Sequence, residues 1–347
     1  MSPMDPTHYD FLSHISWREA WLSLETVSGG DVGAYPGSAV RGALGHLLRP
    51  LLCTGEPGAG ESCGHECGRP DSCEYFALFE QSRAASGGNA PKPLILTSPM
   101  NEDLDAIALG GPVNLPFRTG PPAPGEAIPT LRNEYTLRLE PGALLQAGVR
   151  VVGALSVAVA GVVEAIARHG LHVGGALLRL NSATDGTGRV IYDRRFPAIP
   201  VQSPALNRLS CEPEAARRIR IVFQTPSILK LGTGGVFDPP ELAARFIGHS
   251  MARAVQVHNS LTGRPRLPWL EAPRLGERLA GHRLFHYELS RRSYRQDKWL
   301  QFDGVVGYID LAGELDGAMP FARAAEILHF GQKAAFGLGR IRVLVLE

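Results

Sequence analysis

The chain ends in His-Phe-Gly-Gln-Lys-Ala-Ala-Phe-Gly-Leu-Gly-Arg-Ile-Arg-Val-Leu-Val-Leu-Glu, from His329 to Glu347. A helical pattern over 321–330 leads into this stretch, and an apolar strand over 340–346 closes it. Further upstream, the alternation of polar and apolar residues and the pair Pro239-Pro240 predict a strand, a helix and a hairpin. The strand covers 218–230 and the helix 241–261, and the two strands of the hairpin cover 282–294 and 299–311. The resulting order, β-α-β-β-α-β, is the ferredoxin-like plan.

The loop inside this stretch has the composition of an anion-binding segment. It contains three glycines and three cationic residues: Gly331, Gly337, Gly339, Lys333, Arg340 and Arg342. Glycine readily adopts positive φ and allows close approach of the backbone to a ligand. Cationic side chains beside an accessible backbone are suited to binding a phosphodiester. We therefore expect this loop to contact phosphate groups.

The first half of the chain repeats the same plan with insertions. Strands are predicted at 17–27, 93–97 and 133–139, and helices at 37–52 and 143–169. A hairpin is predicted at 176–193. A proline-rich stretch, 196–213, is the predicted linker. The fold class is thus α+β, with tandem ferredoxin-like (RRM-like) domains. The N-terminal domain covers 1–195 and contains a cysteine-rich insertion at 53–80; the C-terminal domain covers 214–347.

The charge distribution indicates an anionic partner. The formal net charge of the 347 residues is only +1. Between Ala215 and Leu300, however, fifteen Lys or Arg residues stand against six Asp or Glu residues. Thirteen of the fifteen are Arg, whose planar guanidinium binds phosphate in a bidentate manner.

The N-terminus and the apolar segments predict a cytoplasmic protein. Residues 1–17 contain neither a basic segment nor the apolar core of a secretory signal. The most apolar run, 151–163, is too short to cross a bilayer and is interpreted as a buried helix. Five cysteines in a chain of this kind favour a reducing compartment and metal binding over disulfides.

Four of the cysteines lie close together in a glycine-rich segment: Cys53, Cys63, Cys67 and Cys73. Four thiolates can complete a tetrahedral zinc site and leave no open position for water, so the expected metal is structural. His65 could replace one thiolate, an iron–sulfur cluster is the second option, and unliganded thiols are the third. Cys211 lies far away in the linker and is interpreted as a bystander.

Three segments resemble a known family, the CRISPR-associated precursor-RNA processing endoribonucleases of the Cas6 branch of the RAMP superfamily. They are Arg41-Gly42-Ala43-Leu44-Gly45-His46, Arg291-Arg292-Ser293-Tyr294-Arg295-Gln296 with Gly304-Val305-Val306-Gly307, and Leu328 to Arg340. The resemblance is strong over 215–347 and looser over 14–195. It implies CRISPR repeat RNA as the ligand, metal-independent cleavage within each repeat, and subunits of a CRISPR effector complex as further partners.

Cleavage of RNA without metal requires a base, an acid and cations that stabilise the phosphorane. Histidine titrates nearest to neutral pH, which makes His46 the first candidate and His329 the second; each could instead be a capping or packing residue. Lys333 and Tyr35 complete the catalytic candidates. The expected RNA contacts are Arg41, Arg292, Arg295, Lys298, Gly331, Gly337, Gly339, Arg340 and Arg342.

Two alternatives remain open from the sequence. A non-catalytic RAMP subunit would bind a guide RNA and use the histidines only for packing. A metal-dependent nuclease would act at the cysteine cluster, and chelation would then abolish its activity.

Overall fold

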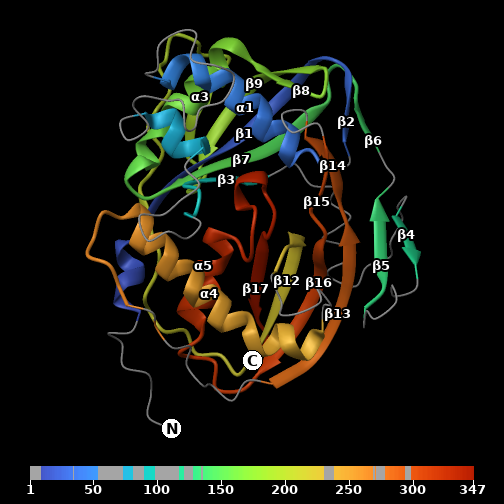
Figure 1. Cartoon of the computed structure of the whole chain (residues 1–347). Helices are drawn as coiled ribbons and strands as arrows, with labels where there is room; N and C mark the ends of the chain where they lie inside the picture. Colours follow the sequence, from blue (N-terminus) through green and yellow to red (C-terminus); the bar gives the residue numbers. More distant parts are fainter. Residues whose placement is uncertain are drawn as a thin grey trace.

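The computed structural model describes residues 9–33, 35–53, 73–80, 90–97, 117–120, 128–133, 136–229, 238–268, 270, 278–293 and 298–347. Two sheets, each with helices on one face, form the upper and lower parts of the molecule in Figure 1. The order of elements in each part is β-α-β-β-α-β. The predicted plan of paired ferredoxin-like units therefore agrees with the observed mixed α/β architecture.

The first sheet has the strand order β10-β9-β1-β7-β3. Its strands are β1 (Ser16–Ser28), β3 (Leu94–Thr97), β7 (Leu144–Val152), β9 (Ala176–Asp185) and β10 (Val190–Asp193), with β8 (Leu171–Val173) and β11 (Asn207–Arg208) attached at its side. The helices α1 (Gly37–Leu52) and α3 (Ala158–His169) pack on one face and form a hydrophobic core with it. A π-helical segment, η4 (Phe76–Glu80), a 3-10 helix, η5 (Ala154–Val157), and a small ribbon of β2 (Gly30–Gly33) and β6 (Thr136–Leu139) complete this part.

The second sheet has the strand order β17-β12-β16-β13-β5-β4. Its strands are β12 (Arg218–Ser227), β13 (Arg278–Glu288), β16 (Gly304–Ala312), β17 (Ile341–Val345), β4 (Phe117–Gly120) and β5 (Thr130–Asn133). The helices α4 (Pro239–Leu261) and α5 (Met319–Leu328) cover one face, and β14 (Ser290–Ser293) and β15 (Lys298–Gln301) extend the β13–β16 hairpin. The short turns are η2 (Asp10–His14) and η6 (Ala334–Phe336).

Local chemistry explains the elements of the second unit. In β12, Ile219, Ile221 and Phe223 point into the core with α4 and α5, so the alternating residues lie on the opposite face. Asp238 caps α4 by accepting a hydrogen bond from the backbone N–H of Glu241, and the prolines occupy the tolerated first turn. Across the described ranges, no helix is both long and apolar enough to cross a membrane.

The predicted long helix over 143–169 is wrong in its first half. Residues 144–152 form β7, which pairs with β1 on one side and β3 on the other. A central strand is apolar on both faces, and an apolar run of this kind cannot be distinguished from a buried helix by periodicity. Gly153, at φ 82°, ends the strand, and α3 begins only at Ala158.

The predicted strand over 133–139 is also divided. Residues 130–133 form β5 and pair in parallel with β13 of the second sheet, whereas 136–139 form β6 and pair with β2. The β4–β5 ribbon therefore adds a piece of the predicted N-terminal domain to the second sheet (Figure 1). In the same way, Phe11 and Leu12 pack in the core of α4 and α5. The domain limits drawn from the sequence remain a prediction.

The chain after β9 is held by the carboxylate of Asp185. This side chain is fully buried and accepts hydrogen bonds from Thr187 Oγ1 (2.6 Å), Arg189 Nε (3.2 Å) and the backbone N–H of Ala205 (3.1 Å). Burial alone would raise the pKa of Asp185, but these hydrogen bonds outweigh it and lower the pKa to about 2. The lowered pKa makes the ionised carboxylate a stabilising feature of the folded chain.

We expect Asp185→Asn to lower the free energy of unfolding at pH 7 by about 2 kcal/mol. The stabilisation is present above the ordinary pKa of Asp and disappears as the pH falls from about 4 towards 2, since the unfolded carboxyl takes up its proton first. Urea unfolding at pH 7 and pH 3 measures this. Glu164→Gln, in an exposed helical pair, serves as the control. A constant difference between the two pH values would contradict the assignment.

Candidate functional site

The loop between α5 and β17 has the backbone conformation that its glycines predict. Gly331, Gly337 and Gly339 have φ values of 86°, 82° and 74°. A Cβ atom at Gly331 would lie 2.5 Å from the carbonyl oxygen of Ile228, and one at Gly339 would lie 2.0 Å from that of Phe330. Only glycine fits these two positions, because both φ and space exclude a side chain.

The end of β12 holds this loop in place. The backbone N–H groups of Gln332 and Gly339 donate to the carbonyls of Ile228 and Pro226, both at 3.0 Å. The buried hydroxyl of Thr225 donates to the carbonyl of Gly337 (3.0 Å) and accepts from the N–H of Arg340 (2.7 Å). Sequence reasoning missed Thr225, because a threonine inside a strand carries no distinguishing signal of its own.

The loop also contacts the start of α1 in the first unit. The phenol of Tyr35 donates to the carbonyl of Phe336 at 3.0 Å, and a Cβ atom at Gly37 would lie 2.0 Å from the same oxygen. Arg41 lies over the ring of Phe336, 4.8 Å from its centroid, and donates to the carbonyl of Phe79. The structure thus brings Tyr35 and Arg41 to the loop, as a site shared by the two units requires.

A small third core surrounds this contact. Tyr35 packs there with Leu131, Phe302 and Leu338, among others from both units. Burial, followed by the nearby Tyr287, raises the pKa of Tyr35 well above its ordinary value. The phenol therefore remains a hydrogen-bond donor at neutral pH and is suited to positioning the loop.

Lys333 lies on the solvent-exposed side of the loop. Its φ of 66° is unusual for a residue with a side chain, and its Nζ lies 5.5 Å from the centroid of the Phe302 ring. This position allows contact with a phosphate group lying along the loop.

His329 is placed differently from His46. His329 is 1% exposed, and its Nδ1 lies 3.0 Å from the carbonyl of Leu338, so this nitrogen carries the proton. Burial, together with the charges of Arg150, Arg340 and Arg253, lowers the pKa of His329 well below its usual range. A neutral, buried imidazole bonded to the loop is suited to supporting the loop's conformation.

His46 lies on the exposed side of α1. The buried side of that helix carries Val40, Leu44 and Leu48. Nine residues separate His46 from Gly37, which corresponds to about 13 Å along the helix axis and to the opposite side of the helix. The structure therefore places His46 on the helix whose start contacts the loop, but on the side of that helix that faces away from the loop.

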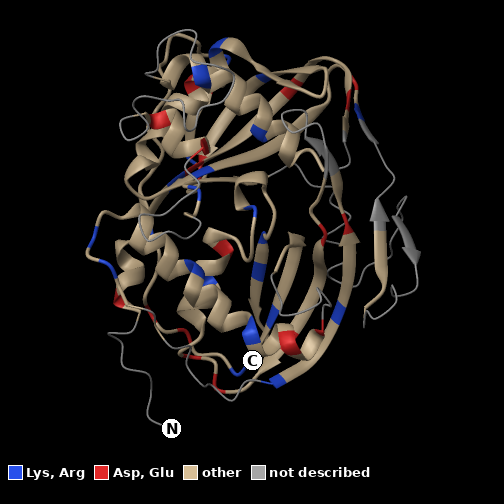
Figure 2. Cartoon of the chain, viewed as in Figure 1, with Lys and Arg blue, Asp and Glu red and all other residues tan. Residues whose placement is uncertain are grey.

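A cationic and aromatic row crosses the face of the second sheet opposite α4 and α5. The register aligns Arg342 of β17 with Val222 of β12, Tyr308 of β16 and Arg283 of β13. The guanidinium of Arg220 stacks on Tyr308, 3.9 Å from the ring centroid. Lys and Arg residues recur along β17, β12 and β13 in Figure 2. Such a face is suited to single-stranded nucleic acid.

The nearly buried carboxylate of Asp310 orients this row by accepting hydrogen bonds from Arg220 Nε at 2.7 Å and Nη2 at 3.0 Å. Sequence reasoning did not select Arg220, Arg283 or Tyr308. The alternation of residues along these strands was the signal that could have placed the three side chains on one face of the sheet.

The remaining predicted RNA contacts lie next to the gap in the described residues at 294–297, or inside it. In the register of the β14–β15 ribbon, Arg292 lies opposite Trp299 and Lys298 lies opposite Ser293, whereas Arg295 lies outside the described residues.

Of the four clustered cysteines, Cys63 and Cys67 lie outside the described residues. Cys73 Sγ lies 3.9 Å from the carbonyl of Leu52, next to Cys53. In the described part of the chain, no group of three or more His, Cys, Asp or Glu could hold a metal ion.

Paired ferredoxin-like units, the second with a glycine-rich loop before its last strand, define the fold class of this chain. Residues 221–341 match the family model described as CRISPR-associated endoribonuclease Cas6. This match confirms the resemblance to the Cas6 family that was seen in the sequence. Residues 16–119 match a model named AF_1859_N, described as an N-terminal domain. No protein of curated function matches the chain in sequence.

Solved structures share the fold. Cas6 of Thermus thermophilus (TTHB231) in a product complex is 16% identical with a TM-score of 0.50, over 94% of this chain and 99% of that one. The matching chain of a partial Cas6-RT-Cas1–Cas2 complex is 11% identical with a TM-score of 0.52, over 96% of this chain and 46% of that one. At these identities the likeness shows the fold alone.

Proposed function

We propose that this protein is a CRISPR precursor-RNA endoribonuclease that binds repeat RNA and cleaves it without a catalytic metal. The observation that carries this proposal is the loop from His329 to Arg340, which lies within the Cas6-family match and against the start of α1. Its fixed glycine backbone and the exposed Lys333 form a place for a phosphodiester between the two units.

In the proposed reaction, the 2′-hydroxyl of the nucleotide before the scissile phosphate attacks the phosphorus. The bond from phosphorus to the 5′-oxygen breaks, leaving a 2′,3′-cyclic phosphate on one product and a 5′-hydroxyl on the other. One group accepts the 2′ proton and another protonates the leaving oxygen. We assign acid or base chemistry at the scissile phosphate to His46, binding of a neighbouring phosphate of the same strand to Lys333 and nearby arginines, and positioning of the loop to Tyr35 and His329.

The test is incubation of the full chain with repeat RNA in EDTA. We expect cleavage at an unchanged rate and products that carry a cyclic phosphate, identified by mass spectrometry. Tight binding without cleavage would instead support the non-catalytic RAMP subunit. Activity lost in EDTA and restored by metal, in a chain that remains folded, would support the metal-dependent nuclease.

We further propose that Cys53, Cys63, Cys67 and Cys73 hold a structural zinc ion. The described pair supports this: Cys73 lies beside the end of α1 that leads into Cys53, and its sulfur accepts the N–H of Phe76 at 3.4 Å. An N–H donor of this kind stabilises a thiolate ligand.

We expect close to one equivalent of zinc per chain by plasma mass spectrometry, because four thiolates form a closed site. Cys67→Ser should lose the metal, and Cys211→Ser, the control, should retain it. Iron with visible absorbance would instead indicate an iron–sulfur cluster. A folded chain without metal would contradict both.

A further inference from the structure

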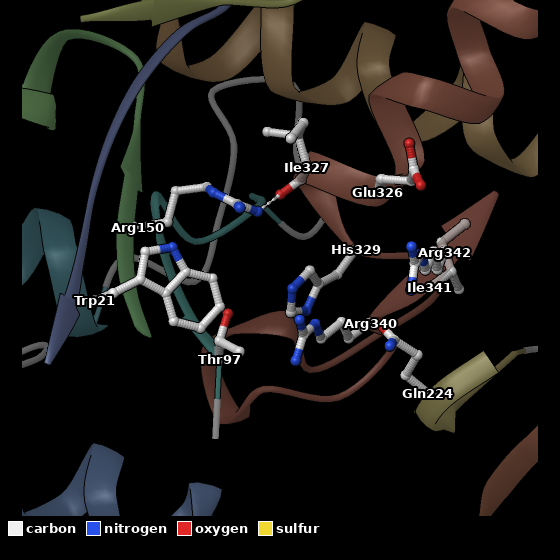
Figure 3. A pocket seen from close by; sticks show the side chains of 10 residues that line it. All are labelled: Trp21, Thr97, Arg150, Gln224, Glu326, Ile327, His329, Arg340, Ile341 and Arg342. Carbon is white, nitrogen blue, oxygen red and sulfur yellow. Dashed lines mark hydrogen bonds between the residues drawn. The ribbon is translucent and has the colours of Figure 1, made fainter. Parts of the chain in front are cut away.

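A pocket of about 340 Å³ lies where the two units meet, beside the base of the glycine-rich loop (Figure 3). Strands β1, β3 and β7 of the first sheet provide one wall. The end of α5 and strands β12 and β17 provide the other. The lining residues used below are Trp21, Arg150, Glu326, His329, Arg340 and Arg342. The volume is at the lower end of the range for small-ligand sites, about 300–1,000 Å³, and suits one nucleotide better than a long segment.

The charges in this pocket do not cancel. Arg150 is paired with Glu19 at 2.6 Å, and Glu326, the acidic residue of the lining, is paired with Arg323 at 3.1 Å. Arg342, in contrast, is exposed and forms no ion pair with any residue that the structure describes. Arg342 therefore gives the pocket an excess of positive charge, which attracts an anion.

Buried groups behind the wall support the same conclusion. His329 is 1% exposed and lines the pocket. Burial lowers the pKa of His329 most, and the positive charges of Arg150, Arg340 and Arg253 lower it further. Arg253 Nε is buried and has no hydrogen-bond partner in the described chain. The guanidinium of Arg253 therefore adds positive charge next to His329, and a bound anion would offset that charge.

Trp21 provides an aromatic wall beside these cations. Its neighbours Ala20 and Leu22 point into the core of the first unit, so the indole lies on the opposite, half-buried face of β1. In the register Trp21 lies opposite Gly148, where a Cβ atom would approach the ring at 3.3 Å. The guanidinium of Arg340 lies 5.7 Å from the indole centroid. A planar aromatic group can stack here next to a cation.

We propose that this pocket binds one unpaired nucleotide of the RNA, with its base against Trp21 and its phosphate between Arg340 and Arg342. The proposal extends the proposed function and rests on it for the source of the nucleotide. It adds a base-stacking residue and a specific pocket to the predicted phosphate contacts. Unpaired nucleotides beside a cleavage site would thereby contribute to recognition of the repeat.

The experiment measures binding of 5′-AMP, adenosine and inorganic phosphate to the full chain by calorimetry. Trp21→Leu should weaken AMP and adenosine about 5- to 100-fold and leave phosphate unchanged, while Trp21→Phe retains most of the affinity. Arg342→Gln should weaken AMP and phosphate about tenfold and leave adenosine unchanged. Arg168→Gln, an exposed arginine on α3, is the matched control.

A fluorescent single-stranded RNA hexamer then identifies the source of the nucleotide. For RNA we expect the same order of variants, and Arg342→Gln should reduce the slope of log affinity against log salt by about one. Absence of AMP binding, or equal AMP affinity in folded wild type, Trp21→Leu and Arg342→Gln, would overturn the proposal. Variants that weaken AMP but not the hexamer would overturn the RNA assignment in favour of a free nucleotide. A wild type that binds AMP here and cleaves no repeat RNA would refute the proposed function and leave the pocket standing.

Discussion

Replacement of His46 by alanine is expected to slow cleavage of repeat RNA by about 10²- to 10⁴-fold, the usual contribution of a general acid or base. Since His46 is exposed on α1, the folded chain should lose neither stability nor much affinity for RNA. Single-turnover cleavage measures the rate, and a filter-binding titration measures the affinity. The pH–rate profile should also lose one limb, because such a profile reports the ionisation of the essential acid and base.

The matched control is His169→Ala, which removes another exposed histidine, at the end of α3. Its rate should equal that of the wild type. Because the imidazole of His46 lies away from the loop, His46 can act only on RNA that extends from the loop across α1. The variant therefore tests whether the RNA takes this path. If His46→Ala cleaves as fast as the wild type, the acid–base role passes to Lys333 or the chain is a binding subunit.

The second large effect is expected at Gly37, where α1 begins. A Cβ atom at this position would lie 2.0 Å from the carbonyl oxygen of Phe336 and 2.9 Å from the Tyr35 ring. Gly37→Ala must therefore displace the loop or the helix and break the hydrogen bond from Tyr35 to Phe336. We expect a loss of about 1–3 kcal/mol in the free energy of unfolding. Because the loop is the proposed phosphate site, RNA cleavage should fall by more than about tenfold.

The same helix supplies the control for this variant. A Cβ atom at Gly42 would meet nothing within 4 Å. Gly42→Ala should therefore stabilise α1 by about 1 kcal/mol, the ordinary helix preference of alanine over glycine. Urea unfolding and the cleavage assay compare the two variants directly. Equal activity of Gly37→Ala and Gly42→Ala would show that the contact between the loop and α1 has no part in catalysis.

Local sequence patterns were sufficient to predict the order of elements in the second unit and the position of helix α1. The sequence predicts α1 at 37–52, and Gly37–Leu52 is what the structure contains. It also predicts the strand, helix and hairpin order after 218, since alternation and proline position act over a few neighbouring residues. The same logic failed over 143–152, where a strand flanked on both sides has no polar face to reveal its period.

The candidate site divides in the same way. Its glycines and cations were visible in the sequence, because positive φ and charge are properties of single residues. The hydrogen bond from Tyr35 to Phe336 joins residues 301 positions apart, and the pocket brings Trp21 to Arg340. The burial of His329 likewise depends on packing. Thus the sequence alone determined the order of the elements and the chemistry of the loop. Only the tertiary structure decided which side chains of the first unit face that loop, because such pairings depend on how two sheets pack and not on any local period.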